Sequence, residues 1–211
     1  MAVWTISAQE GAGGDQIAAR LAAAAGVPLL ERNELVAIAH EIDPEHLEAE
    51  DFDEIEKRFG GRFSGLAFNM AITTGQGSTA ALQELKFRHK LPELARSILN
   101  EAARQPCVIV AVGAFAALPD HPKAIHVRLR APLACRIAAY QRERLVDREC
   151  AEKKVKHDDR AQHAWVHSLF HVDIDDSRMF ALVLDTSRFN PDRLVDVLLA
   201  AGGVQAGLLP T

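Results

Sequence analysis

A glycine-rich segment near the start of the chain has the residue types and spacing of a phosphate-binding loop. Residues 7–14 read Ser-Ala-Gln-Glu-Gly-Ala-Gly-Gly. They follow a β-branched and aromatic run at residues 3–6 and precede an apolar helical pattern that begins at Asp15. The backbone N–H groups of such a turn and the positive end of a helix dipole together attract anionic oxygens. The nucleotide-contacting candidates are Gly11, Ala12, Gly13, Gly14, Asp15 and Gln16.

The loop itself carries no cation. When the pattern G-x-x-x-x-G-K-[ST] is laid on the chain without gaps, its lysine position falls on Gly14 and its Ser/Thr position on Asp15. The strongly basic stretch of the chain lies much later, between Arg136 and Arg160. Any phosphoryl group bound at the loop would therefore need positive charge from a distant part of the sequence.

The composition indicates an ordinary globular protein. The chain has 211 residues, 48% of them hydrophobic, and a formal net charge of −5, which argues against a general nucleic-acid-binding protein. No stretch reaches the roughly 20 apolar residues of a membrane span. The three cysteines, Cys107, Cys135 and Cys150, are widely separated. We therefore expect a reduced, cytoplasmic protein that binds neither nucleic acid nor membrane.

Strand and helix patterns alternate along the chain and predict an α/β fold with a parallel sheet and helices on both faces. The expected strands are residues 3–6, 27–30, 107–112, 125–129 and 181–184. The expected helices are residues 15–25, 33–40, 82–104 and 191–199. A further helix is expected to begin with Pro132 in its first turn and to continue into the basic stretch. Residues 41–56 read as an acidic helix and residues 60–77 as irregular.

The ordered combination of these segments resembles a known family. Its points are residues 6–7, 11–14 and 17–18, then residues 30–32, 106–110, 126–127, 131–133, 136–137, 159–160 and 182–187. Together they resemble the cytidylate kinase-like branch of the P-loop nucleoside monophosphate kinases. The resemblance implies a P-loop three-layer sandwich as one domain over residues 1–211, with a helical acceptor-site insert at 41–80 and a helical lid at 141–178.

The resemblance also implies ATP-dependent phosphorylation of a nucleoside monophosphate, with CMP or dCMP as acceptor and ATP and Mg²⁺ as cofactors. It assigns catalysis to Arg136, Arg142 and Arg160, and binding of the monophosphate to Glu31 and Arg32. The expected partner is the monophosphate substrate, and a homodimer is an open alternative to a monomer.

The chain departs from the family pattern at three polar positions. The family has an arginine early in the loop where this chain has Ala8, and Gly-Arg where it has Ala111 and Val112. Its Asn-Thr near the end is Asp185-Thr186 here. A second hypothesis is therefore a nucleotide-binding sensor of kinase fold without turnover.

Two further alternatives come from other patterns. Gly11-x-Gly13 followed by Glu31 is similar to a dinucleotide-binding fingerprint, although its third glycine position is Gln16. Three histidines, His163, His167 and His171, recur at a spacing of four with Asp158 and Asp159 nearby, as a metal site on one helix face would require. Since Trp165, Leu169 and Phe170 give this helix a packed side, we interpret the histidines as its solvated side and expect no metal there.

Overall fold

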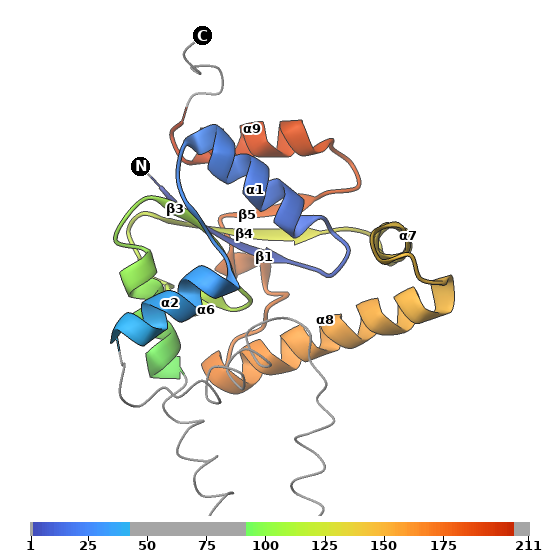
Figure 1. Cartoon of the computed structure of the whole chain (residues 1–211), viewed down its shortest axis with the longest axis horizontal. Helices are drawn as coiled ribbons and strands as arrows, with labels where there is room; N and C mark the ends of the chain where they lie inside the picture. Colours follow the sequence, from blue (N-terminus) through green and yellow to red (C-terminus); the bar gives the residue numbers. More distant parts are fainter. Residues whose placement is uncertain (1, 43–91, 205–211) are drawn as a thin grey trace, which may run out of the picture.

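The computed structural model describes residues 2–42 and 92–204, and a parallel five-stranded sheet runs through them (Figure 1). The strands are β1 (Val3–Ala8), β2 (Leu29–Leu30), β3 (Cys107–Val110), β4 (Ala124–Arg130) and β5 (Leu182–Asp185). Their spatial order is β2-β3-β1-β4-β5, so β1 lies at the centre between β3 and β4. The predicted α/β class with a parallel sheet is confirmed.

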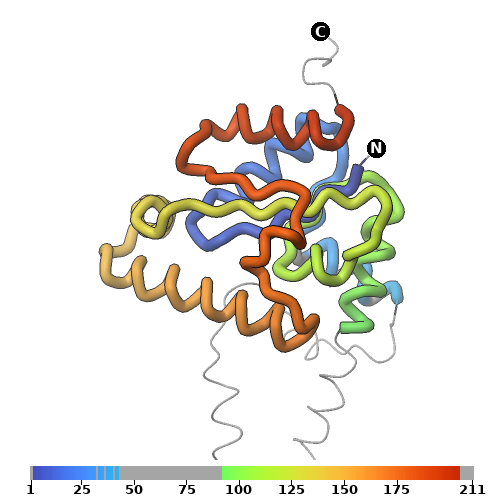
Figure 2. The backbone as a smooth tube through the Cα atoms, turned by 180° about the vertical axis from the view of Figure 1, so that it is seen from behind, coloured from blue at the N-terminus to red at the C-terminus, as the bar shows by residue number. Residues whose placement is uncertain are grey.

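Helices cover both faces of the sheet. One face packs against α1 (Gly14–Ala25) and α9 (Pro191–Ala201), and the other against α2 (Arg32–Ile42), α6 (Ala114–Ala117) and the long α8 (Arg148–Phe170). Residues 92–102 form a further helix on that second face. The short α7 (Leu133–Arg144) lies beyond the tip of β4, and η1 (Ser177–Met179) precedes β5 (Figures 1 and 2). No helix among the described residues is long and apolar enough to cross a membrane.

The two faces of β1 explain the two hydrophobic cores. Successive strand residues point to opposite faces, so Trp4 and Ile6 join the core under α1 and α9, while Val3 joins the core on the α8 side. Trp4 is fully buried, and its indole Nε1–H donates to the carbonyl of Leu198 in α9 (2.9 Å). A Cβ atom at Gly202, just after α9, would overlap the Trp4 ring. The last helix therefore docks on the first strand through this tryptophan.

The Trp4→Phe variant is expected to lose about 2 kcal/mol of unfolding free energy, because it removes a buried hydrogen bond and leaves ring volume unfilled. Urea unfolding followed by circular dichroism measures this loss. Val197→Ala, on an exposed position of the same helix, serves as control and should change stability by less than about 0.5 kcal/mol. Equal stability of Trp4→Phe and wild type would show that α9 docks without help from this contact.

Several predicted boundaries were wrong. The strand expected at residues 107–112 ends at Val110, because the chain turns at Gly113, which has a φ of 90°. The single helix expected after Pro132 is two helices, since Leu145 adopts a left-handed conformation (φ 54°) that ends α7. Pro132 is the residue before that helix instead of its first residue. The short α6 was not predicted.

The strand order also bears on the dinucleotide alternative. Dinucleotide-binding sheets of the doubly wound type place β1 beside β2, whereas β3 separates these two strands here. That alternative is therefore wrong for the fold. Of the expected acceptor-site insert at 41–80, residues 43–80 lie outside the described residues. The assignment of the whole chain to one domain stays a prediction.

Candidate functional site

The glycine loop connects the centre of the sheet to the start of α1. β1 ends at Ala8, two residues later than the strand predicted at residues 3–6, and the N–H of Gln9 donates to the carbonyl of Leu129 in β4 (3.0 Å). The N–H of Ala12 closes the turn by donating to the carbonyl of Gln9 (3.0 Å). Gly11 and Gly13 both have left-handed backbone conformations, with φ of 78° and 73°. Residues with a Cβ rarely adopt these angles, so the turn requires glycine at both positions.

The start of α1 leaves donors free for an anion. Gly13 is the residue before the helix and offers no side chain to cap it. The first hydrogen bond within the helix runs from the N–H of Ile17 to the carbonyl of Gly13 (3.1 Å). The N–H groups of Gly14, Asp15 and Gln16 therefore have no acceptor within the helix. A Cβ built on Gly13 would meet no other described residue within 4 Å, its chain neighbours aside, so the turn is open on that side.

Arg136 of α7 is buried against this loop, with only 5% of its surface exposed. Its guanidinium donates to the backbone carbonyl of Glu10 (3.2 Å) and to that of Ala131 (3.0 Å). It also forms a two-point ion pair with Asp159 of α8, at 3.0 and 2.9 Å. This arginine, which the resemblance assigns to catalysis, thus connects the loop to α8 in this structure. A catalytic role for it stays a prediction.

The main chain of Arg136 also packs closely against Gly11. A Cβ built at Gly11 would lie 2.5 Å from the carbonyl oxygen of Arg136, closer than atoms can approach. The loop therefore touches α7 through both the side chain and the main chain of Arg136. A displacement of α7 or α8 would therefore also displace the loop.

The other two predicted catalytic arginines are exposed. The Nε–H of Arg142 donates to the carbonyl of Ala138 (3.3 Å), and that of Arg160 donates to the carbonyl of Lys156 (3.1 Å). Both bonds are to the residue's own helix, and among the described residues neither arginine pairs with a carboxylate. The structure thus brings only Arg136 of the three to the loop, and the roles of Arg142 and Arg160 stay predictions.

A group of charges near the loop involves Glu10, Lys154 and Asp158. Lys154 of α8 pairs with Asp158, whose side chain is fully buried. Burial raises the pKa of the Glu10 carboxyl, and the negative charges of Asp158 and Asp15 raise it further, while Lys154 and Arg144 act in the opposite direction. The spacing of four between Lys154 and Asp158 is a helical ion-pair signal that could have identified this pair.

The Glu10→Gln variant is expected to be more stable than wild type at pH 8, and the difference should vanish below the ordinary carboxyl pKa. Since the folded-state pKa of Glu10 is raised, the folded protein holds this proton more tightly than the unfolded chain. Wild-type stability therefore falls as pH rises from the ordinary value through the raised one. Urea unfolding of both proteins at pH 3.5 and pH 8 tests this, with the exposed Glu143→Gln as control. A pH-independent difference would contradict it.

The predicted monophosphate-binding residues lie at the end of β2. Glu31 is exposed, and its backbone N–H donates to the carboxylate of Glu34 (3.1 Å), while α2 begins at Arg32. Partial burial raises the pKa of Glu31, and so do the charges of Asp15 and Glu34. Asp15 on α1 therefore lies within electrostatic reach of Glu31. The binding role of Glu31 and Arg32 stays a prediction.

His163 and His167 lie on the solvated side of α8, as the sequence indicated, and His171 follows the end of the helix. His163, His167 and His171 are exposed, whereas Leu169 and Phe170 are buried. The rings of His163 and His167 are parallel, with centroids 6.5 Å apart. The acidic neighbours proposed from sequence are not their partners, because Asp159 pairs with Arg136 and Asp158 with Lys154.

Comparison with known proteins agrees with this architecture. A model of the cytidylate kinase-like family matches residues 3–188. An uncharacterized protein from Eubacterium ventriosum has a similar structure, with a TM-score of 0.66 at 16% identity over 96% of this chain and 99% of that one. The protein TT1252 from Thermus thermophilus gives a TM-score of 0.50 at 20% identity over 95% and 97%.

A shikimate kinase from Bacteroides thetaiotaomicron is also similar, with a TM-score of 0.49 at 13% identity over 96% of this chain and 99% of that one. Comparison with curated proteins gives no match. At their low identities the first two structures show a similar fold alone, while the family match covers most of the sequence, including the glycine loop and α8. The chain belongs to the cytidylate kinase-like family.

Proposed function

We propose that this protein transfers the terminal phosphoryl group of ATP to a nucleoside monophosphate, with CMP or dCMP as the preferred acceptor. The observation that carries the proposal is the start of α1. There an open glycine turn presents three N–H groups without acceptors in the helix, at the carboxyl end of the central strand. Membership of the cytidylate kinase-like family supports the same reaction class.

The proposal gives each part of the site a task. The N–H groups of Gly14, Asp15 and Gln16 would hold the phosphates of ATP, and Asp15 would hold Mg²⁺ through water. Bound Mg²⁺ would neutralise charge on the phosphates. Glu31 and Arg32, at the end of the neighbouring β2, would receive the monophosphate. Arg142 and Arg160 would supply positive charge when the lid closes.

Arg136 would act as a positioning residue in this scheme. Its guanidinium is already occupied by the Glu10 carbonyl and by Asp159, so it holds the loop in shape while exposed arginines meet the phosphates. Such preorganisation places donors without rearrangement during the reaction.

A second candidate function is nucleotide sensing without turnover. The loop has no lysine or arginine, and the buried arginine beside it is neutralised by Asp159. A loop that binds phosphate through backbone groups alone can retain affinity while catalysis is lost, since transition-state charge then lacks a cation. The two functions therefore differ in turnover and agree in binding.

One experiment distinguishes them. A coupled ADP-release assay with ATP, Mg²⁺ and each common nucleoside monophosphate measures turnover, and thermal-shift titration with the same nucleotides measures binding. Turnover that is fastest with CMP or dCMP supports the kinase. Binding without turnover favours the sensor, and the absence of both up to millimolar nucleotide contradicts each. Gel filtration in the same buffers tests the open question of a homodimer.

A further inference from the structure

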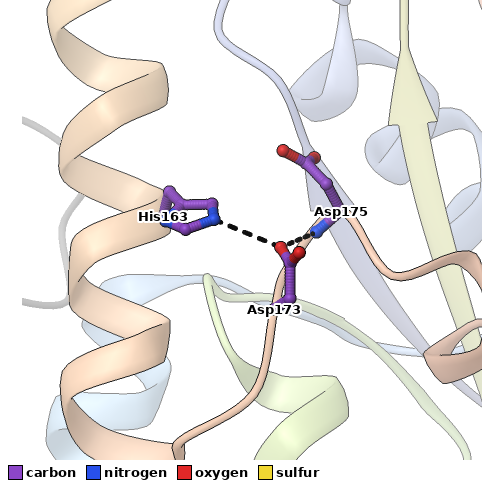
Figure 3. Close-up of side chains that lie close together, drawn as sticks. All are labelled: His163, Asp173 and Asp175. Carbon is purple, nitrogen blue, oxygen red and sulfur yellow. Dashed lines mark hydrogen bonds and ion pairs between the residues drawn. The ribbon is translucent and has the colours of Figure 1, made fainter.

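Three side chains with metal-binding atoms gather beside the carboxyl-terminal half of α8. His163 projects from α8, and Asp173 and Asp175 come from the segment that follows the helix (Figure 3). One ring nitrogen and one carboxylate oxygen from each aspartate lie within 4.8 Å of one another. All three residues are exposed, so an ion from solvent can reach them.

The separation of two of these atoms suits two ligands of one ion. The Nε2 atom of His163 lies 3.2 Å from Oδ1 of Asp173. Zinc binds imidazole nitrogen and carboxylate oxygen at about 2.1 Å, so neighbouring ligands at angles of about 90° to 109° lie roughly 3.0 to 3.4 Å apart. An ion could therefore enter between these atoms with little movement of the backbone.

One carboxylate, that of Asp175, is held from outside the cluster, and that of Asp173 is held from within it. Oδ1 of Asp175 accepts from Nη2 of Arg128 in β4 (3.1 Å), and Arg128 is only 6% exposed. Oδ1 of Asp173 accepts from the backbone N–H of Asp175 (2.8 Å). Asp175 keeps its other carboxylate oxygen for an ion, and Oδ1 of Asp173 can accept this bond and still bind an ion through its second lone pair. Outer partners of this kind orient the ligands of metal sites.

The buried arginine fixes the position of one of the three ligands, Asp175. The second arm of its guanidinium, Nη1, is buried and has no hydrogen-bond partner among the described residues. The ion pair with Asp175 is thus the contact that fixes a buried cation at this place in the sheet. Two aspartates against one arginine leave the cluster with a net negative charge.

We infer that His163, Asp173 and Asp175 bind a divalent transition-metal ion of the zinc type. One imidazole with two carboxylates suits zinc, cobalt or manganese, whereas calcium requires six to eight oxygen ligands. The ion would join α8 to the segment that leads into β5. The site is separate from the glycine loop and does not depend on the proposed kinase activity. It also differs from the metal site considered in the sequence analysis, because Asp158 and Asp159 take no part.

Calorimetric titration of the full chain with Zn²⁺ and Co²⁺ tests the inference. The exposed Cys135 and Cys150 are first replaced by serine, because thiolates also bind zinc. His163→Gln and Asp173→Asn should each weaken binding at least about tenfold. His167→Gln is the matched control, since this exposed histidine lies one turn further along the same helix, and it should leave the affinity unchanged.

The visible absorption of bound Co²⁺ gives a second readout that depends on the ligands themselves. A cobalt spectrum that is lost in His163→Gln and kept in His167→Gln supports the site. The inference is overturned if neither ion binds at millimolar concentration. Equal loss of affinity in the His163 and His167 variants would also overturn it, because binding would then belong to the histidine stripe in general.

Discussion

Replacement of Arg160 by alanine is expected to lower the turnover of ATP and CMP at least about a hundredfold, while nucleotide affinity weakens only a few-fold. The charge that spreads over a transferring phosphoryl group must be met by cations, and one well-placed arginine is worth about a thousandfold or more. The loop has no cation and Arg136 is paired with Asp159. The guanidinium of Arg160 is exposed, and within the described part of the chain its one hydrogen bond is to a carbonyl of its own helix. It is therefore free to reach the phosphates when the lid closes.

Steady-state kinetics test this expectation. Arg160→Ala and Arg142→Ala should lower kcat more than they raise KM, because the lid arginines meet the phosphates mainly in the closed state. Arg104→Ala is the control: this exposed arginine pairs with Glu101 shortly before β3 begins, away from the carboxyl edge of the sheet. Wild-type turnover in both lid variants would rule out the lid mechanism.

The Gly13→Ala variant is expected to abolish the rise in melting temperature that nucleotides cause, although the protein remains folded. At this position a Cβ meets no protein atom within 4 Å, so the cost to folding is the strain of a left-handed alanine, about 1–2 kcal/mol. The Cβ would instead project into the open space before the helix, where phosphate oxygens would lie.

Gly26 provides a closely matched control for this experiment. It ends the same helix, has a similar φ of 64°, and a Cβ there also meets no protein atom within 4 Å. Gly26→Ala should thus lose similar stability and keep the nucleotide-dependent shift. Thermal-shift titration with ATP and ADP compares the two variants. If Gly13→Ala binds nucleotide like Gly26→Ala, the phosphate site lies elsewhere.

Much of the fold could be predicted because its signals are local. Gly26 ends α1 in a left-handed conformation, and the side chain of Asn190 caps α9, which begins with Pro191. Each of these residues acts through its own backbone preference or through a neighbour three residues away. The burial of Ile17, Leu21 and Leu198 likewise follows from helical spacing.

The features that were missed depend on contacts between distant segments. Leu145 adopts φ of 54° although leucine has no preference for it, so the break between α7 and α8 cannot be recognised from local sequence. The pairing of Arg136 with Asp159 and with the Glu10 carbonyl joins three separate parts of the chain. A basic stretch looks the same in sequence whether its arginines are free or paired.

Because β1 lies at the centre of the sheet, it cannot pair until later parts of the chain have been synthesised. Both strands that flank it come much later in the sequence, at Cys107–Val110 and Ala124–Arg130. At a synthesis rate of about 5–20 residues per second, the first strand must wait on the order of 5 to 25 s for its neighbours. During that time Trp4 and Ile6 have neither a sheet nor α9 to cover them. These two apolar side chains therefore stay open to non-native contacts until the later strands and α9 have been made.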